Sequence, residues 1–189
     1  AYLRAQINPH FLFNALNSVS SLIRSNPVKA QETVVELSRY LRQIMQMSKR
    51  RFVTVEEEMS HITQLLDIEQ VRYSDRLTKS IHISESCNQK EIPSLILQPI
   101  FENALKFGLH ESTGPATIKG DVWCDEVNLY VSISNNYEKE AHTAKGTGKG
   151  LKNVKQRLEL IYGKMYRMHI SDDGSNFEVR LSIPVKVEF

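Results

Sequence analysis

The first third of the chain repeats apolar residues at three- and four-residue steps, which is the period of a helix with one buried face. This pattern predicts a first helix across residues 3–23 with an apolar stripe made of Leu3, Ile7, Phe11, Leu16, Val19 and Ile23. Pro9 falls inside this helix. Because proline removes a backbone donor and presses on the preceding turn, we expect the helix to bend or loosen there.

Two further helices are predicted by their start signals. Asn26 is a good N-cap and Pro27 a good first helical residue, so a second helix should run from there to Ser48. Its inward residues should be Val34, Leu37, Leu41, Ile44 and Met45. Thr54 and Glu57 have the spacing of a capping box, so a third helix should begin there. Its inward residues should be Met59, Ile62, Leu65, Leu66 and Val71.

The pattern changes after residue 76. Alternating apolar and polar residues predict strands within 80–86, 117–124, 128–135, 166–173 and 177–187. Between them, helical spacing predicts helices over 92–109 and 151–162. Strands mixed with helices indicate an α+β fold for this part of the chain. We therefore expect a helical region over residues 1–77 and an α+β domain over residues 78–189.

Composition and charge exclude several classes of function. The 189 residues include 24 basic and 22 acidic ones without a run of five like charges, which argues against direct nucleic-acid binding. Cys87 and Cys124 have neither metal-type spacing nor the density of a disulfide scaffold, so we expect both to be reduced, as in the cytoplasm. No stretch approaches the roughly 18 apolar residues of a membrane span. The chain begins in mid-pattern, so any membrane segment should lie upstream of it.

A glycine-rich loop precedes the last predicted helix. Gly146, Gly148 and Gly150 alternate with polar residues, and such glycines let backbone N–H groups approach a phosphate at a helix N-terminus. The loop matches neither of the two common phosphate-binding glycine patterns. A flexible loop without a ligand explains such a run about equally well.

The segment QPIFENALKFG places three polar residues on an otherwise apolar helix. Asn103 and Lys106 are three residues apart and can face the same cavity. The amide oxygen of Asn103 suits Mg²⁺, the ammonium of Lys106 suits a phosphate, and the carboxylate of Glu102 suits a base or an orienting group. Taken alone, the three residues are equally typical of a solvated helix face.

His10 is the candidate nucleophile. A neutral imidazole can attack a phosphoryl group when a base takes its other proton, and Asn14 lies one helical turn away, where it can fix the tautomer. The competing interpretation is that His10 is an ordinary helix histidine that makes hydrogen bonds and has no catalytic role. The remaining histidines have no metal-ligand spacing and are assigned no function: His61, His82, His110, His142 and His169.

Three segments in order, LRAQINPHFLFNALNSVSSLI, LQPIFENALKFG and GTGKGLKNVKQRLELIYG, resemble the LytS/YehU-like branch of bacterial sensor histidine kinases. The resemblance covers almost the whole chain. It implies a helical dimerisation and histidine phosphotransfer region over residues 1–77. It further implies that residues 78–189 form an ATP-binding catalytic domain, a two-layer α/β sandwich of the kind shared with gyrase, Hsp90 and MutL.

The resemblance also implies an activity and a setting. The chain would be the cytoplasmic portion of an inner-membrane sensor, would act as a homodimer, and would pass a phosphoryl group from ATP to a response regulator of LytTR type. Carried over by position, the implied site consists of the phosphoacceptor His10, the Mg²⁺ ligand Asn103 with Glu102 and Lys106 beside it, the adenine-binding residue Asn135, and the lid residues Gly146, Gly148, Gly150 and Leu151. The lid, residues 137–150, should be mobile without nucleotide.

Three positions depart from the family pattern. Phe107 stands where relatives carry a histidine, and Phe11 stands where the commonest kinases have an acidic residue after the phosphoacceptor. The strand end SISNNYEKE replaces the Asp-x-Gly-x-Gly adenine box, so Asn135 can accept a hydrogen bond but supplies no charge. Two alternatives therefore stay open: a degenerate kinase acting as a dimeric scaffold or phosphatase, and an ATP-driven clamp of the same nucleotide-binding class.

Overall fold

The computed structural model describes residues 8–138 and 149–185. Its helices are α1 (Pro9–Ser25), α2 (Pro27–Met47), α3 (Val55–Tyr73), α4 (Gln98–Leu105) and α5 (Lys149–Tyr162). Short turns follow three elements: η2 (Ser74–Arg76), η3 (Glu85–Cys87) and the π-helical turn η4 (Lys106–His110). The strands are β1 (Phe52–Thr54), β2 (Leu77–Ile83), β3 (Glu91–Pro93), β4 (Ala116–Cys124), β5 (Asn128–Asn136), β6 (Arg167–Asp172) and β7 (Asn176–Pro184). The predicted α+β class is confirmed.

The main sheet has five strands in the order β2-β4-β5-β7-β6. β2 runs parallel to β4, and every other neighbouring pair is antiparallel. A separate two-stranded ribbon joins β1 to β3, with Val53 opposite Ile92. This ribbon matters for the site because it ties the start of α3 to the segment that leads into α4.

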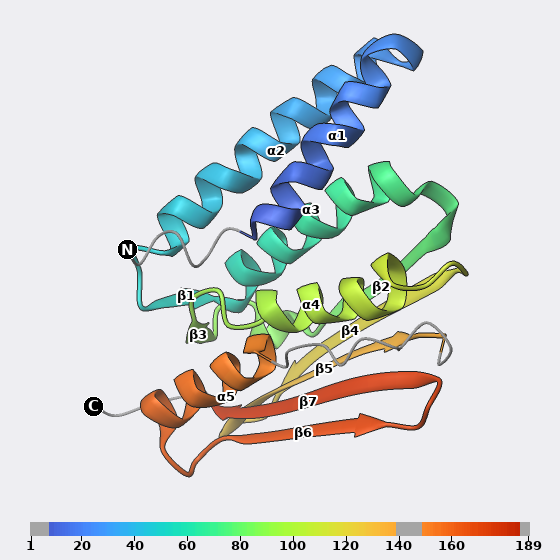
Figure 1. The fold of residues 1–189 in the computed structure, drawn as a ribbon. Helices are drawn as coiled ribbons and strands as arrows, with labels where there is room; N and C mark the ends of the chain where they lie inside the picture. Colours follow the sequence, from blue (N-terminus) through green and yellow to red (C-terminus); the bar gives the residue numbers. More distant parts are fainter. Residues whose placement is uncertain (1–7, 139–148, 186–189) are drawn as a thin grey trace.

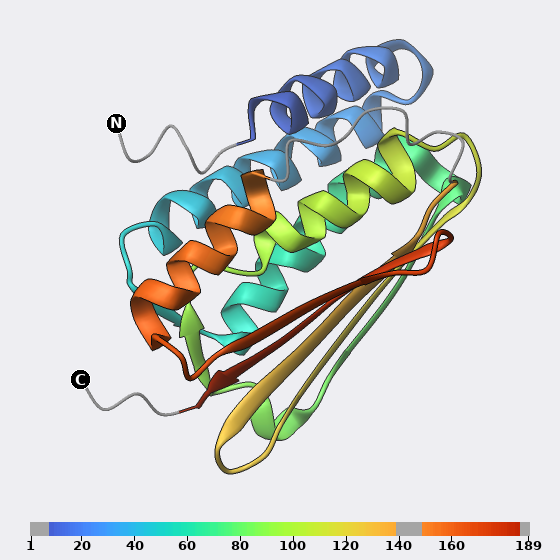
Figure 2. The ribbon, with the colours of Figure 1, turned by 60° about the horizontal axis from the view of Figure 1, so that its bottom comes forward.

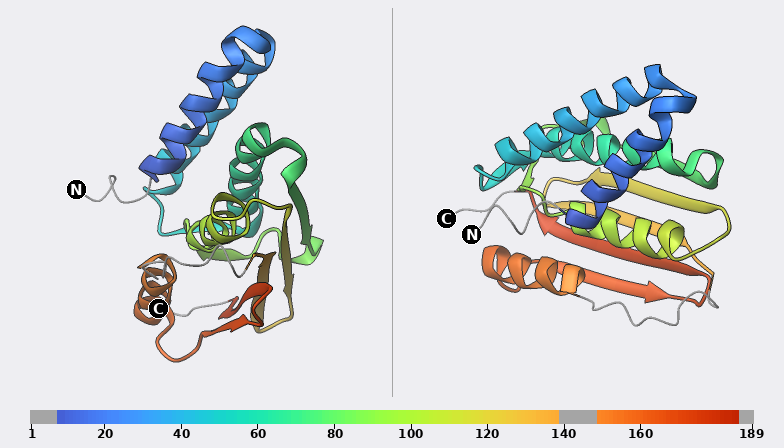
Figure 3. Two further views of the ribbon diagram at one scale, coloured as in Figure 1. Left: turned by 45° about the vertical axis from the view of Figure 1, so that its right-hand side comes forward. Right: turned by 45° about the horizontal axis from the view of Figure 1, so that its top comes forward.

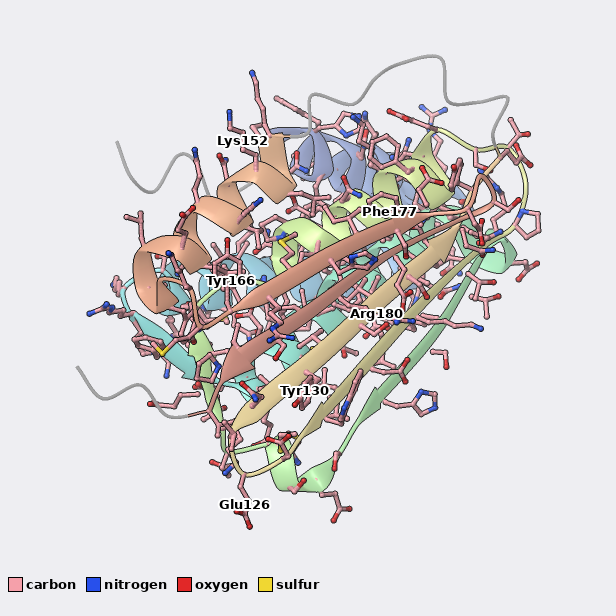
Figure 4. All side chains as sticks on the ribbon, turned by 90° about the horizontal axis from the view of Figure 1, so that it is seen from below. Glu126, Tyr130, Lys152, Tyr166, Phe177 and Arg180 are labelled. Atoms are coloured by element: carbon pink, nitrogen blue, oxygen red, sulfur yellow. The ribbon has the colours of Figure 1, made fainter. Side chains whose placement is uncertain are left out.

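The elements form three layers (Figure 1). Helices α3, α4 and α5 cover one face of the sheet, and the α1–α2 hairpin packs on the far side of these helices (Figure 2). One continuous apolar core extends from Phe11 in α1 through α3 and α4 to Ile183 in β7. The opposite face of the sheet carries no helix of the described chain, and Tyr130 and Arg180 lie on it (Figure 4).

Both helix starts predicted from capping residues are confirmed. Asn26 caps α2 by accepting a hydrogen bond from the backbone of Lys29. Thr54 and Glu57 form the reciprocal capping box of α3. In both cases a short polar side chain satisfies N–H groups that the helix itself leaves without partners.

The predicted bend at Pro9 is wrong. Pro9 is the first residue of α1, and Asn8 before it is extended at φ −69° and ψ 107°. A residue before proline is pushed toward this extended conformation, and proline at the first helical position gives up no hydrogen bond. Pro9 therefore starts the helix, and the part of the predicted stripe before it, Leu3 and Ile7, lies outside the described residues.

The predicted helix over 92–109 is wrong at its start, while its end lies within one residue of the end of the π-helical turn η4. Residues 91–93 form β3, and a buried turn precedes the true start of α4 at Gln98. After Leu105 the helix widens into η4, where the N–H of Glu111 donates to the carbonyl of Lys106 at 2.9 Å. The apolar run misled the prediction because a fully buried strand and turn are as uniformly apolar as a buried helix.

Several residues predicted to point inward are exposed in the single chain. Phe11, Val19, Leu37 and Ile44 are buried as expected. Exposed apolar residues on the same two helices include Leu16, Ile23, Val34 and Met45. The apolar surface of the α1–α2 hairpin is therefore wider than α3 alone covers.

The boundary near residue 77 stays a prediction. α3 lies before it but is bonded to residues beyond it: the backbone N–H groups of Leu95 and Leu97 donate to the Glu58 carboxylate at 2.7 and 2.9 Å. Within the described residues, no helix has the length and apolarity needed to cross a membrane.

Candidate active site

An open cavity of about 570 Å³ lies where α1, α3, α4 and α5 meet. The N-terminal end of α1 lies over α4 in the right-hand view of Figure 3, and Asn8 just before it is 3.4 Å from Glu102 of α4. The cavity is lined by predicted site residues from three separate segments, namely His10, Glu102, Asn103, Lys106 and Gly150. The structure thus brings together residues up to 140 positions apart in the sequence.

His10 sits in the first turn of α1, exposed at the rim of the cavity. Asn8 fixes this turn because its side-chain oxygen accepts hydrogen bonds from the backbone N–H groups of His10 and Phe11, at 3.1 and 3.4 Å. The amide nitrogen of Asn14 lies 3.2 Å from Nδ1 and 3.3 Å from Nε2 of the His10 ring. It can pair with one ring nitrogen at a time and so select which nitrogen carries the proton.

Glu102 connects α4 to the start of α1. Its carboxylate accepts hydrogen bonds from the Gln98 amide at 2.7 Å and from the Asn8 amide at 3.4 Å. Burial raises the pKa of Glu102, partly offset by these two donors. The same Asn8 side chain that caps α1 is thus held by Glu102, and the backbone of His10 is positioned through it.

A buried polar chain continues behind Gln98. Its amide oxygen lies 3.1 Å from Nε2 of His61, and its amide nitrogen lies 3.4 Å from the hydroxyl of Tyr40. The Tyr40 and His61 rings stack with centroids 4.6 Å apart. Burial lowers the pKa of His61 to about 4, so this ring is neutral at physiological pH. These contacts from α2 and α3 fix the amide that in turn holds Glu102.

Lys106 and Asn103 face the cavity from the end of α4. The Lys106 ammonium lies 3.5 Å from the Glu111 carboxylate and 4.9 Å from the centroid of the Phe107 ring. The side-chain nitrogen of Asn103 is buried and has no hydrogen-bond partner. A buried amide without a partner is costly, and it suits a site completed by a ligand.

Asn135 lies at the end of β5, next to α4 and η4 but not among the residues that line the cavity. It is 2% exposed, and its side-chain oxygen is buried without a partner. Gly108 packs so closely that a Cβ there would lie 3.1 Å from the Asn135 amide nitrogen and 3.0 Å from the carbonyl of Asn136. The unpaired oxygen of Asn135 fits the acceptor role that the adenine amino group requires.

The glycine loop is only partly described. Gly146 and Gly148 lie outside the described residues, as does most of the predicted lid. Gly150 belongs to the first turn of α5 and lines the cavity together with Lys149. Leu151 is half-buried, packs against the core and does not line the cavity.

Sequence reasoning missed several residues of this cavity, among them Asn8 before α1, Glu69 on α3 and His110 on η4. The His110 Nε2 atom lies 3.2 Å from the Glu69 carboxylate, and the His10 and His110 rings meet edge to face with centroids 6.0 Å apart. Glu69 lies among the apolar positions of α3 and belongs to no short motif, so the sequence gives no local signal for it. The spacing of His110 to the other histidines indicates no metal site, so the sequence alone assigns it no function.

Comparisons with known proteins show the family and the fold. Residues 1–77 match the family model described as histidine kinase. The sensor protein LytS of Staphylococcus saprophyticus is 32% identical over 194 residues, which cover 96% of this chain and 33% of that protein. The sensor histidine kinase YpdA of Escherichia coli is 35% identical over 191 residues, with the same coverage. The chain belongs to the LytS-like histidine kinases.

Solved structures show that the fold of this LytS-like kinase is shared more widely. The histidine kinase domain of the blue-light activated kinase from Erythrobacter litoralis EL346 aligns with a TM-score of 0.55 at 11% identity, over 97% of this chain and 91% of that one. The catalytic domain of histidine kinase ThkA aligns with a TM-score of 0.54 at 13% identity, over 72% of this chain and 97% of that one. The chain spans about a third of the length of the curated relatives it matches.

Proposed function

We propose that this chain is the catalytic core of a sensor kinase that transfers the γ-phosphoryl group of ATP to His10 and then passes it to a response regulator. The observation that carries the proposal is the single cavity lined by His10 from α1, Asn103 and Lys106 from α4 and η4, and Gly150 from α5. A nucleophile, a phosphate partner and a helix N-terminus thus face one space, as phosphoryl transfer requires.

The residues around the cavity suit a nucleotide. Lys106 and the backbone of the glycine loop, Gly146, Gly148 and Gly150, would offset the charge of the phosphates. Asn135 and Leu151 do not line the cavity; beside it, Asn135 would accept a hydrogen bond from adenine and Leu151 would pack against the nucleotide. Asn103 lines the cavity, and its side-chain oxygen would hold Mg²⁺, which neutralises phosphate charge when bound.

Glu102 would orient the phosphoacceptor. Its bond to Asn8 places the start of α1, and therefore His10, relative to α4. A role as the base that deprotonates the imidazole is the alternative for this carboxylate. Replacement by glutamine keeps a hydrogen-bonding group at this position. An autophosphorylation rate unchanged by Glu102→Gln would remove the role as a base, and a rate unchanged by Glu102→Ala, which loses the bond to Asn8, would remove the orienting role.

The decisive experiment is a labelling assay. The purified chain is incubated with Mg²⁺ and γ-labelled ATP beside a His10→Ala variant, and label on protein is measured after base and after acid treatment. We expect base-stable, acid-labile label with the native chain and none with the variant, because phosphohistidine has this stability profile. Label that persists in His10→Ala would place the phosphoacceptor elsewhere.

A degenerate kinase is the second candidate, and Phe107 is the observation that favours it. Its ring lines the cavity and lies under the Lys106 ammonium, which is also paired with Glu111. A chain that binds ATP without labelling His10 would be a scaffold or a phosphatase. A chain that hydrolyses ATP without label would be a clamp ATPase, and a binding titration with a hydrolysis assay separates these outcomes.

The setting of the domain is part of the same proposal. The relatives are named as sensor proteins, and this chain corresponds to about a third of each. We infer that it acts as a homodimer on the cytoplasmic side of an inner membrane, joined to a sensor segment upstream. Its phosphoryl acceptor would be a response regulator, with the LytTR type as the first to test.

A further inference from the structure

Glu69 and His110 form an ion-pairing couple that no part of the proposed reaction uses. Glu69 is 3% exposed and His110 15%, and the His110 Nε2 atom lies 3.2 Å from the Glu69 Oε2 atom. Both residues line the same cavity as His10. A buried carboxylate that accepts a hydrogen bond from one imidazole nitrogen leaves the other nitrogen free to accept a proton.

The His110 ring is held from several sides. It stacks on Tyr73 with centroids 5.5 Å apart. The Arg76 guanidinium donates to the carbonyls of Leu109 and Ser112, at 3.2 and 2.5 Å, and so clamps the chain on both sides of His110. His110 is the last residue of the π-helical turn η4, and its ring contacts Glu69 and Tyr73 of α3. A side chain fixed so firmly beside a nucleophile is positioned for chemistry.

The His110 ring also contacts the His10 ring directly. The two rings meet at 61° with centroids 6.0 Å apart, which lets one water molecule bridge a nitrogen of each. The Glu102 carboxylate, by contrast, already accepts hydrogen bonds from Asn8 and Gln98. The position after the phosphoacceptor holds Phe11, which cannot accept a proton.

We propose that His110, held by Glu69, accepts the proton that the His10 ring loses as it takes up the phosphoryl group. This inference rests on the proposed function. One nitrogen of neutral His10 bonds to the γ-phosphorus while the bond from that phosphorus to the ADP oxygen breaks. The proton on the other His10 nitrogen passes to His110, and ADP leaves. His110 is then an imidazolium beside the Glu69 carboxylate and returns its proton to water.

The roles of the two residues differ. His110 is the proton acceptor, and Glu69 is a positioning residue that fixes its tautomer and stabilises the imidazolium. Several elements bring charged and titratable groups near the His110 ring: His10 from α1, Glu69, Arg72 and Tyr73 from α3, Arg76 from η2, Glu102 from α4, Lys106 from η4, and Glu111 just after η4.

The test compares His110→Ala with a matched control, His82→Ala. His82 also faces a carboxylate, Asp121 at 3.4 Å, but lies on the exposed sheet far from the cavity. Initial rates of His10 labelling are measured at saturating Mg²⁺ and ATP from about pH 5 to pH 9, and ATP affinity is measured separately. We expect His110→Ala to slow labelling by about 100-fold or more with ATP affinity unchanged, and His82→Ala to match the native chain.

Two further readouts distinguish proton transfer from a structural role. In the native chain both His10 and His110 must be neutral, so in the acid range the logarithm of the labelling rate should rise against pH with a slope of about two. In His110→Ala only His10 must be neutral, so the slope should be about one. Added imidazole should restore part of the lost rate by filling the space beside Tyr73. Glu69→Gln, which keeps a hydrogen bond but not the charge, should give a loss of about tenfold.

Each outcome has a defined meaning. A native rate in His110→Ala overturns the inference while label on His10 still supports the proposed function. A slow His110→Ala variant with an unchanged acid slope and no imidazole rescue also overturns it, because the residue then acts only on structure. Absence of label in the native chain, with ATP bound, refutes the proposed function itself and the inference with it.

Discussion

Asn8 has two functions at the residue scale, because its oxygen caps α1 and its nitrogen reaches Glu102. Asn8→Asp separates these functions. Aspartate is as good an N-cap, but its carboxylate repels the Glu102 carboxylate. We expect native thermal stability to within about 1 kcal/mol and slower labelling of His10, since the start of α1 is no longer held on α4. Thermal unfolding and initial labelling rates measure the two effects.

The matched control is Asn26→Asp. Asn26 caps α2 in the same way, by accepting from the backbone of Lys29 at 3.0 Å, and no hydrogen bond joins its side chain to a carboxylate in the described structure. Both rate and stability should stay native. If Asn8→Asp labels as fast as Asn26→Asp, the link from Glu102 to the cap has no part in placing the phosphoacceptor.

Single residues also show how far a sequence predicts a site. His10, Glu102, Asn103, Lys106 and Gly150 were recognisable because each stands in a short segment with its own chemical logic, and these five line one cavity. Glu69 and His110 carry no such local signal. They are 41 positions apart and meet only because α3 and η4 pack together. Their pairing can therefore be seen in the folded structure but not in the sequence.

At the scale of elements, helix starts were predictable where a side chain caps its own helix, as at Asn26 and Thr54. The interpretation of Pro9 failed because apolar spacing continued before it, while the backbone preference of the residue before proline decided the boundary. The turn before α4 was missed because its buried residues depend on a distant partner, Glu58, rather than on turn-forming residues.

Glu58 makes that turn sensitive to pH. Its carboxylate accepts from the backbone of Leu95, which has an unusual positive φ of 58°, and from Leu97. Burial raises the pKa of Glu58 to about 7 from an ordinary value of 4.5. The folded state therefore holds this proton more tightly than the unfolded state, and the contribution to stability is lost as pH rises through that interval.

Glu57→Gln and Glu58→Gln should thus change the pH dependence in opposite directions. The hydrogen bond from Arg50 lowers the pKa of Glu57, so its contribution is present at neutral pH and lost as pH falls. The quantity to follow is the free energy of unfolding of the native chain minus that of each glutamine variant. For Glu58 this difference should decrease as pH rises from about 4.5 to 7. For Glu57 it should increase as pH rises through the acid range. Urea unfolding across pH measures both, and equal slopes for the two variants would contradict the assignment.

At the scale of the whole molecule, the three layers leave two faces uncovered by the described chain. The open face of the sheet is mostly polar, with Arg180 paired to Glu178 and Trp123 stacked on Tyr130 (Figure 4). The outer face of the α1–α2 hairpin is apolar: Phe13, Leu16, Ile23, Val28, Val34, Val35 and Met45 are all exposed. A patch of this kind on a helical pair is typical of a surface that a partner covers.

The homodimer predicted from the sequence therefore has a defined surface to test. Leu16 and Ile23 are seven residues apart on one face of α1 and are 48% and 58% exposed. We expect the double change to glutamate to give a folded monomer, because it introduces charges where two copies would exclude water. Sedimentation velocity over a range of concentrations measures the state, and circular dichroism checks the fold.

Leu160→Glu is the control for that experiment. Leu160 is 87% exposed and belongs to α5 rather than to the hairpin, so its replacement adds charge and removes apolar surface without changing Leu16 or Ile23. It should stay dimeric. A dimer that survives the double change on α1 would place the interface elsewhere on the molecule, and a native chain that is monomeric at every concentration would refute the homodimer. His10 is carried on the same helix as this surface. Loss of the dimer with native labelling of His10 would therefore show that transfer can occur within one chain.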